Sequence, residues 1–278
     1  MKLKTQTGLL AICCLAGWAN AAPIVQSVAG LTAADITAAR DAFRVTLGGG
    51  TVAGANGDFG GLRREINWDG VPDAFAAPNS LPANFFNANS PRGAVFSTPG
   101  SGFQVSANAA VAPINFGNID PTYSGTFAPF SAPRLFTPIG SNIVDVTFFL
   151  PGLSTSAGVR GFGSVFSDVD LANTTSIEYF DTSNVSLGKF FVPSLAGNQT
   201  FSFLGVSSFD GGALIGRVRI TNGNAALGAG VTDQNGNPRD VVVMDDFLYS
   251  APVGVPEPAT VVSTLAGLSL LFFARRRK

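Results

Sequence analysis

Histidine is absent from this sequence of 278 residues, and cysteine occurs only at Cys13 and Cys14, in an apolar stretch near the N-terminus. Without imidazole the chain cannot build Ser-His-Asp or Cys-His nucleophile arrangements, or any histidine metal site. Beyond that stretch there is no thiol, which excludes disulfides, thiol nucleophiles and zinc–thiolate sites from the rest of the chain.

Charged side chains are also scarce, at 13% of residues, and the 17 basic residues nearly balance the 18 acidic ones. Six of the basic residues lie at the two ends, so the body (residues 22–250) keeps 11, of which Lys189 is the single lysine. The body is therefore mildly acidic. Such a surface repels phosphate backbones, so we predict no nucleic-acid partner, and it tolerates or attracts divalent cations.

What the chain does contain is apolar residues and turn formers. Hydrophobic residues make up 46% of the sequence, which includes 33 Gly, 17 Pro and 24 Phe. This composition is too apolar for a disordered chain and too rich in Gly and Pro for a helical bundle. It predicts an all-β protein.

The N-terminus has the three parts of a signal peptide. Lys2 and Lys4 precede an apolar run at 8–17, and Ala19 and Ala21 form a small-x-small cleavage site. We predict that residues 1–21 are removed by signal peptidase. A lipoprotein interpretation through Cys13 is disfavoured because the large Ile12 precedes it, where a small residue is usual.

The C-terminus combines a short motif, an apolar run and a basic end. After the linker at 251–258, residues 259–274 are predicted to form a transmembrane helix of about 24 Å, slightly short of a bilayer core. The basic end should stay in the cytoplasm and the body outside it. The motif consists of Val255, Pro256, Glu257 and Pro258, and the basic end (275–278) of Arg275, Arg276, Arg277 and Lys278.

This order resembles the PEP-CTERM sorting tail over its whole length, although an ordinary tail anchor is the simpler alternative. The resemblance implies that exosortase cuts the tail at the outer face of the inner membrane. It also implies a Gram-negative host with an export system linked to exopolysaccharide.

Strand signals dominate the body. In one segment, Val144, Val146 and Phe148 alternate with polar residues, as in a half-buried strand. Spacings of roughly 12–15 residues leave no room for helical crossovers, and they favour an antiparallel, jelly-roll-like β-sandwich. The predicted strands span 142–148, 159–167, 175–180, 187–192, 200–206, 214–220 and 240–248.

The N-terminal part of the body (22–140) is predicted to contribute short strands and long Gly/Pro/Asn-rich loops to the same sandwich as residues 141–250. Apolar stretches at 94–96 and 103–105 are candidate strands. One helix is expected at 33–46, capped by Thr32, with Ile36, Ala39 and Phe43 on one face. The phenylalanines are expected in the core.

A second set of motifs lies in the body, at 64–70, 161–170, 177–181, 187–188 and 245–249. Together these segments resemble uncharacterised PEP-CTERM surface proteins whose bodies are similar to jelly rolls of carbohydrate-binding modules. That resemblance implies no catalytic residues.

Carboxylates suggest a Ca²⁺ site, since Ca²⁺ takes six to eight oxygen ligands. We favour Asp168 and Asp170 together with Asp245 and Asp246, over a loop that contains Asp233 and ends near Asp240. The loop, which also contains Asn235 and Asn237, is not an EF-hand, because Pro238 stands where Gly is needed. The alternative is that these side chains only form turn hydrogen bonds.

Other residues suit sugar recognition. Trp68 and Asp69 lie in a turn-like segment, where the indole could stack on a sugar ring, although a buried position is favoured. Arg217 and Arg219 share a strand face. We expect them to form a solvated face with nearby carboxylates, and a sugar site there would need an aromatic neighbour.

An enzyme is the competing hypothesis. Glycoside hydrolysis needs two carboxyl groups about 5–10 Å apart, and Glu65, Asp69, Glu178 and Asp181 are candidates. Nothing in the sequence marks one of them as an acid. We therefore expect a non-enzymatic, exported protein that is adhesive or associated with exopolysaccharide. Ca²⁺ is the one candidate cofactor. A structural matrix protein without a ligand is the third hypothesis.

Overall fold

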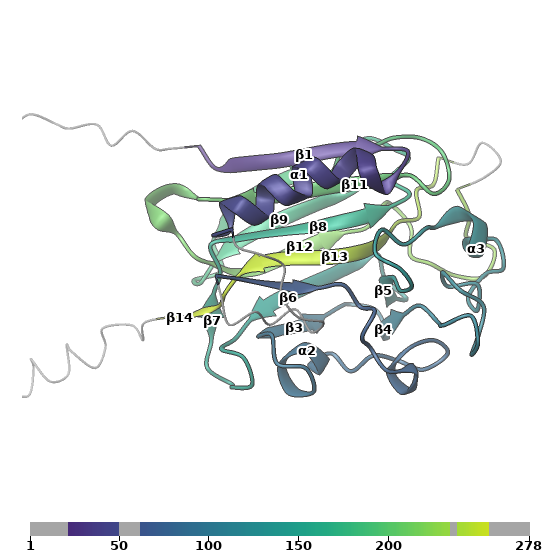
Figure 1. Ribbon diagram of the computed structural model, residues 1–278, viewed down its shortest axis with the longest axis horizontal. Helices are drawn as coiled ribbons and strands as arrows, with labels where there is room; N and C mark the ends of the chain where they lie inside the picture. Colours follow the sequence, from purple (N-terminus) through teal and green to yellow (C-terminus); the bar gives the residue numbers. More distant parts are fainter. Residues whose placement is uncertain (1–21, 50–61, 234–237, 256–278) are drawn as a thin grey trace, which may run out of the picture.

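A computed structural model describes residues 22–49, 62–233 and 238–255 (Figure 1). The predicted signal peptide, the segment Pro256–Pro258, the predicted span 259–274 and the basic end lie outside these ranges. Among the helices of the described residues, none is long and apolar enough to cross a membrane.

Within the described ranges the chain forms two main antiparallel sheets, as the strand spacing predicts. The first sheet has seven strands in the order β1-β11-β8-β13-β5-β4, with β2 also paired to β13. Its strands are β1 (Ile24–Gly30), β2 (Arg63–Ile66), β4 (Gly102–Val105), β5 (Phe136–Ile139), β8 (Gly161–Ser167), β11 (Phe201–Ser207) and β13 (Val243–Ser250).

The second sheet has five strands in the order β10-β9-β12-β6-β3, and a two-stranded ladder joins β14 to β7. The second sheet contains β3 (Ala94–Ser97), β6 (Ile143–Phe148), β9 (Ser176–Asp181), β10 (Ser186–Phe191) and β12 (Ile215–Thr221). The ladder contains β7 (Ala157–Gly158) and β14 (Val253–Gly254).

From β6 onward the chain moves repeatedly between the two sheets. It passes from β6 to β8, back to β9 and β10, then to β11, β12 and β13 in turn. This alternation is why the gaps between strands exceed tight hairpin turns. The antiparallel, jelly-roll-like sandwich expected from the sequence is confirmed.

The seven strands predicted after residue 141 all form, with ends within about three residues of the expected ones. The candidate strands at 94–96 and 103–105 also form, as β3 and β4. Strand β1 was not predicted. It is an edge strand that contains Ile24, Val25 and Val28, and its pairing partner β11 lies far along the chain.

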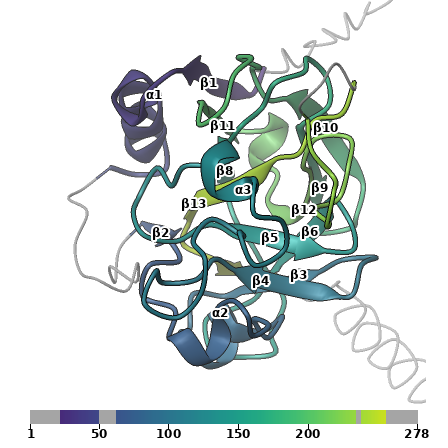
Figure 2. The same ribbon diagram turned by 90° about the vertical axis from the view of Figure 1, so that its right-hand side faces the viewer.

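Helix α1 (Ala33–Thr46) has the predicted bounds. The Thr32 backbone N–H donates to the Asp35 carboxylate at 2.8 Å, which satisfies one of the free N–H groups at the helix start. Ile36 and Phe43 are fully buried. Helix α1 covers the outer face of the first sheet beside β1 and β11 (Figure 1, Figure 2).

The remaining helices of the described residues are single turns, namely η1 (Asp73–Phe75), α2 (Phe85–Ala88), α3 (Tyr123–Thr126) and η2 (Asp210–Gly212). Every residue of β8, β11 and β13 is buried, because the second sheet covers one face of these strands and α1 and loops cover the other.

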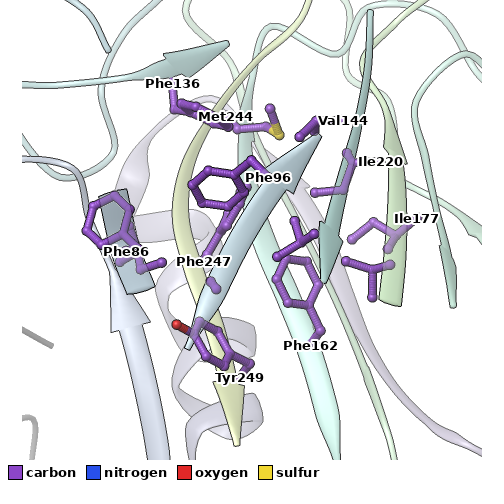
Figure 3. Packing of buried hydrophobic residues seen from close by; sticks show 14 of the residues in the cluster. Phe86, Phe96, Phe136, Val144, Phe162, Ile177, Ile220, Met244, Phe247 and Tyr249 are labelled. Carbon is purple, nitrogen blue, oxygen red and sulfur yellow. The ribbon is translucent and has the colours of Figure 1, made fainter. Parts of the chain in front are cut away.

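Aromatic rings fill the space between the sheets, as expected for the phenylalanines (Figure 3). The indole of Trp68 stacks on Phe136 at a centroid distance of 4.0 Å, and Phe96 and Phe247 pack around them. Phe162 packs in turn against Phe247. Such contacts add to the hydrophobic stabilisation of the buried area. The core therefore ties residues 62–140 to the later strands.

Candidate functional site

Three carboxylates meet where β8 ends, on the side of the sandwich that carries α3 (Figure 1). Asp168 and Asp170 follow β8 directly, and Asp233 comes from the long connection between β12 and β13. One oxygen of each lies within 4.8 Å of the others. Asp168 is fully buried, and burial together with the neighbouring Asp233 raises the pKa of its carboxyl group to about 10.

Backbone amides of the β10–β11 connection hold two of these carboxylates. The Gln199 N–H donates to Oδ1 of Asp168 at 3.1 Å, and the Gly197 N–H donates to Oδ1 of Asp170 at 2.8 Å. These two bonds fix the carboxylates in place. They leave Oδ2 of Asp168 without a hydrogen-bond partner among the described residues.

The loop that contains Asp233, which the sequence analysis ranked second, contributes the third carboxylate of this group. Asn235 and Asn237 lie outside the described residues, and Asp240 has a different position. Oδ1 of Asp240 accepts a hydrogen bond from the Asp170 N–H at 3.0 Å, and its other oxygen accepts one from the Thr174 hydroxyl. Asp240 thus supports the turn that carries Asp170.

Asp245 and Asp246 do not join this group, so the prediction that they converge with Asp168 and Asp170 is wrong. The ladder between β13 and β8 shifts register between Met244 and Phe247. This bulge changes the face to which side chains point. It places both carboxylates against the loop between α3 and β5. The sequence favoured this pair over Asp233, but Asp233 is the residue that joins Asp168 and Asp170.

That loop supplies hydrogen bonds to the buried pair. The Phe130 and Ser131 N–H groups donate to Oδ2 of Asp245 at 2.6 and 3.1 Å. The Ser131 hydroxyl donates to Asp246 at 2.8 Å, and Arg40 lies 3.7 Å from the same carboxylate. Burial raises the pKa of both carboxyl groups, and for Asp245 the charge of Asp246 adds to the effect. These contacts join β13 to the loop that contains Phe130 and Ser131.

Trp68 is 1% exposed, and its Nε1 donates to the Asp245 carbonyl at 3.0 Å. A buried ring cannot stack on a sugar, so the ligand-binding role considered for it is wrong and the buried alternative is correct. The adjacent Asp69 is half-buried and accepts a hydrogen bond from the Arg134 N–H at 3.1 Å. Burial raises the pKa of Asp69 to about 7.

The outer face of the second sheet carries the arginine pair. Arg217 and Arg219 both bind the Asp145 carboxylate, at 2.6 and 2.8 Å, as expected for paired charges. The Arg217 guanidinium also lies 3.7 Å from the centroid of the Phe180 ring. Phe180 is the aromatic neighbour that a sugar site would need, and it is the register partner of Arg217.

A pocket of about 190 Å³ opens beside this cluster, at the end of the sheet near β7. Hydroxyl, amide, carboxylate and guanidinium groups gather there next to the last described residue, Val255. Its polar lining residues are Thr147, Ser156, Asp181, Thr182, Asn184 and Arg217.

The carboxylates considered for glycoside hydrolysis have other partners. Glu65 is buried and forms ion pairs with Arg44 at 2.6 Å and Arg63 at 2.8 Å. Glu178 accepts a hydrogen bond from Ser186, and Asp181 accepts from the backbone of the β9–β10 turn. Glu65 thus joins α1 to β2, and Asp181 stabilises the turn between β9 and β10.

Comparison with known families gives a result for the C-terminus. Residues 254–278 match the model described as the PEP-CTERM protein-sorting motif. The chain carries a PEP-CTERM sorting tail. The predicted resemblance of the tail is thereby confirmed, and such a tail marks an exported protein that is anchored in the membrane before exosortase processes it.

No curated protein matches the chain. A solved structure, the enzymatically active domain of tailspike protein 4 from bacteriophage CBA120, is similar at 14% identity and a TM-score of 0.23. The match covers 62% of this chain and 20% of that one, so this chain spans about one fifth of the tailspike chain. A likeness this weak carries no argument about function.

Proposed function

We propose that the protein is exported, is released from its PEP-CTERM tail by exosortase, and then acts as a non-enzymatic adhesive β-sandwich at the cell surface or in the exopolysaccharide matrix. The observation that carries the proposal is the tail. Its match begins at Gly254, the residue at which β14 ends. A processing enzyme would therefore meet its motif directly beyond the folded sandwich.

Polysaccharide is the partner that suits the outer face of the second sheet. The pocket beside Arg217 offers hydrogen-bond donors and acceptors, and Phe180 and Phe191 supply apolar ring surface on the same sheet. Sugar rings present hydroxyl groups at their edges and C–H groups on their faces, so they suit such a mixture. The acidic body also supports a partner other than nucleic acid.

We further propose that the protein has no glycoside hydrolase activity. Glu65 is paired with two arginines, and a carboxylate with two cationic partners is a poor proton donor. Asp69 has the raised pKa of an acid, but its neighbours Asp245 and Asp246 are buried and hydrogen-bonded to a loop. They are poorly placed to attack a sugar or activate water for hydrolysis.

A glycan array probed with the exported protein, with and without Ca²⁺, tests the proposal. We expect binding to acidic or neutral exopolysaccharide fragments, and at least about tenfold weaker binding for Arg217→Ala, equivalent to about 1.4 kcal/mol. Arg239→Ala is the matched control, since this partly exposed arginine does not line the pocket. Release of reducing sugar would establish an enzyme instead, and no binding to any glycan would leave a structural matrix protein.

A further inference from the structure

The strongest unexplained feature of the sandwich is the group formed by Asp168, Asp170 and Asp233. Their nearest oxygens lie within 4.8 Å of one another. Two ligands on opposite sides of one Ca²⁺ are about 4.6–5.2 Å apart, because each bond is 2.3–2.6 Å long. A single ion can therefore contact all three carboxylates with side-chain shifts of at most a few tenths of an ångström (~0.2–0.5 Å).

The second observation is that these oxygens are buried without partners. Oδ2 of Asp168 and both carboxylate oxygens of Asp233 lack solvent contact and, among the described residues, lack a hydrogen bond. Asp168 is fully buried as a residue. Buried polar atoms are nearly always hydrogen-bonded or bound to an ion, so three such atoms in one group need an explanation.

No ion pair found among the described residues compensates this charge. In those ranges, the ion pairs of arginine involve other carboxylates, namely Asp41, Glu65, Asp73, Asp145 and Asp246. Asp168, Asp170 and Asp233 have oxygens within 4.8 Å of one another, and among the described residues no arginine or lysine forms an ion pair with them. A divalent cation between them would compensate two of these negative charges.

We propose that Asp168, Asp170 and Asp233 bind Ca²⁺, and that the ion fastens the β12–β13 connection to the end of β8. The donor set consists of carboxylate oxygens, which suit Ca²⁺ and not the softer metals that prefer nitrogen or sulfur. Calcium sites in extracellular modules typically have dissociation constants of about 0.1–1 mM, so we expect a weak site of this kind. The site does not depend on the adhesive function.

Calcium titration of the purified full-length chain in detergent, first stripped with EDTA, tests the site. Calorimetry should show one saturable site per chain, and CaCl₂ should raise the melting temperature by a few degrees, because the ion binds the folded state only. MgCl₂ should do so less effectively, since Mg²⁺ demands a tighter octahedral arrangement. A wild-type chain that binds no calcium at 10 mM, a concentration about tenfold above the weakest expected dissociation constant, would overturn the proposal.

Neutral variants separate a calcium ligand from a merely structural carboxylate. Asp233→Asn and Asp170→Asn should each weaken binding about tenfold or more. Asp168→Asn should remove the calcium-dependent gain in melting temperature, yet be at least as stable as wild type in EDTA, since the amide still accepts from the Gln199 N–H. Asp246→Asn is the matched control and should bind calcium as wild type does. Unchanged binding by Asp233→Asn, or loss with Asp246→Asn alone, contradicts the assignment.

Discussion

Replacing Gly205 with alanine should displace helix α1 from the first sheet. Gly163 in β8 and Gly205 in β11 are register partners, and together they leave a hollow in the sheet. The ring of Phe43, fully buried on α1, occupies it. A Cβ at position 205 would lie 2.7 Å from two atoms of that ring, and one at position 163 would lie 2.8 Å from a third.

The size of the effect follows from these distances. Carbon atoms pack at about 3.5–4.0 Å, so the ring must retreat by about 1 Å. Overpacking of this kind costs about 1–3 kcal/mol. A shift of 1 kcal/mol changes the melting temperature of a domain of this size by about 2–4 °C, so Gly205→Ala should lower it by roughly 2–12 °C.

A double-mutant cycle shows whether Phe43 is the cause. Phe43→Ala alone should cost about 3–5 kcal/mol through the cavity it leaves. In the double variant, the methyl group added by Gly205→Ala no longer meets the ring, so the combined cost should fall short of the sum of the two single costs by about 1–3 kcal/mol. Gly125→Ala is the matched control, because a Cβ there has no heavy atom within 4 Å.

Urea or thermal unfolding, followed by circular dichroism on the purified protein, gives the four free energies of unfolding. Strict additivity of the two substitutions, or a melting temperature for Gly205→Ala within about 1 °C of wild type, would refute the account of how α1 is seated. Gly125→Ala should leave the free energy of unfolding within about 0.5 kcal/mol of the wild-type value.

Two further predictions concern Asp69 and the sorting motif. Burial raises the pKa of Asp69 from 3.8 to about 7, so the folded state holds a proton that the unfolded chain releases, and the free energy of unfolding should fall as pH rises between these values. Since Asp69 is only half-buried, the loss should be on the order of 1–2 kcal/mol. Asp69→Asn should abolish this part of the pH dependence, and equal slopes for the variant and wild type from about pH 4 to 7 would contradict the prediction. Pro256→Ala combined with Glu257→Ala should leave the tail uncut, so that full-length protein accumulates in the inner membrane; wild-type protein found intact there would indicate a plain tail anchor.

Several features could be predicted from the sequence because they depend on neighbours along the chain. The PEP-CTERM tail is a linear order of a short motif, an apolar run and basic residues, and its match begins at Gly254. Helix α1 follows from Thr32 and the spacing of Ile36, Ala39 and Phe43. The strands after residue 141 follow from alternating side chains and turn residues between them.

The tertiary structure decided which distant residues meet. Strand β1 pairs with β11, which lies far along the chain, and nothing in the residues of β1 specifies that partner. Phe180 meets Arg217 through the register of β9 and β12. A shift of one residue in register would send a side chain to the opposite face, and no local pattern fixes that register.

The carboxylates show the same division most clearly. The sequence indicated that Asp168 and Asp170 belong to one group of oxygen ligands, and the structure brings their carboxylates together. The sequence could not select Asp233 over Asp245 as their neighbour. That choice depends on the bulge in β13 and on the path of the β12–β13 connection, both of which are set by packing between segments far apart in the chain.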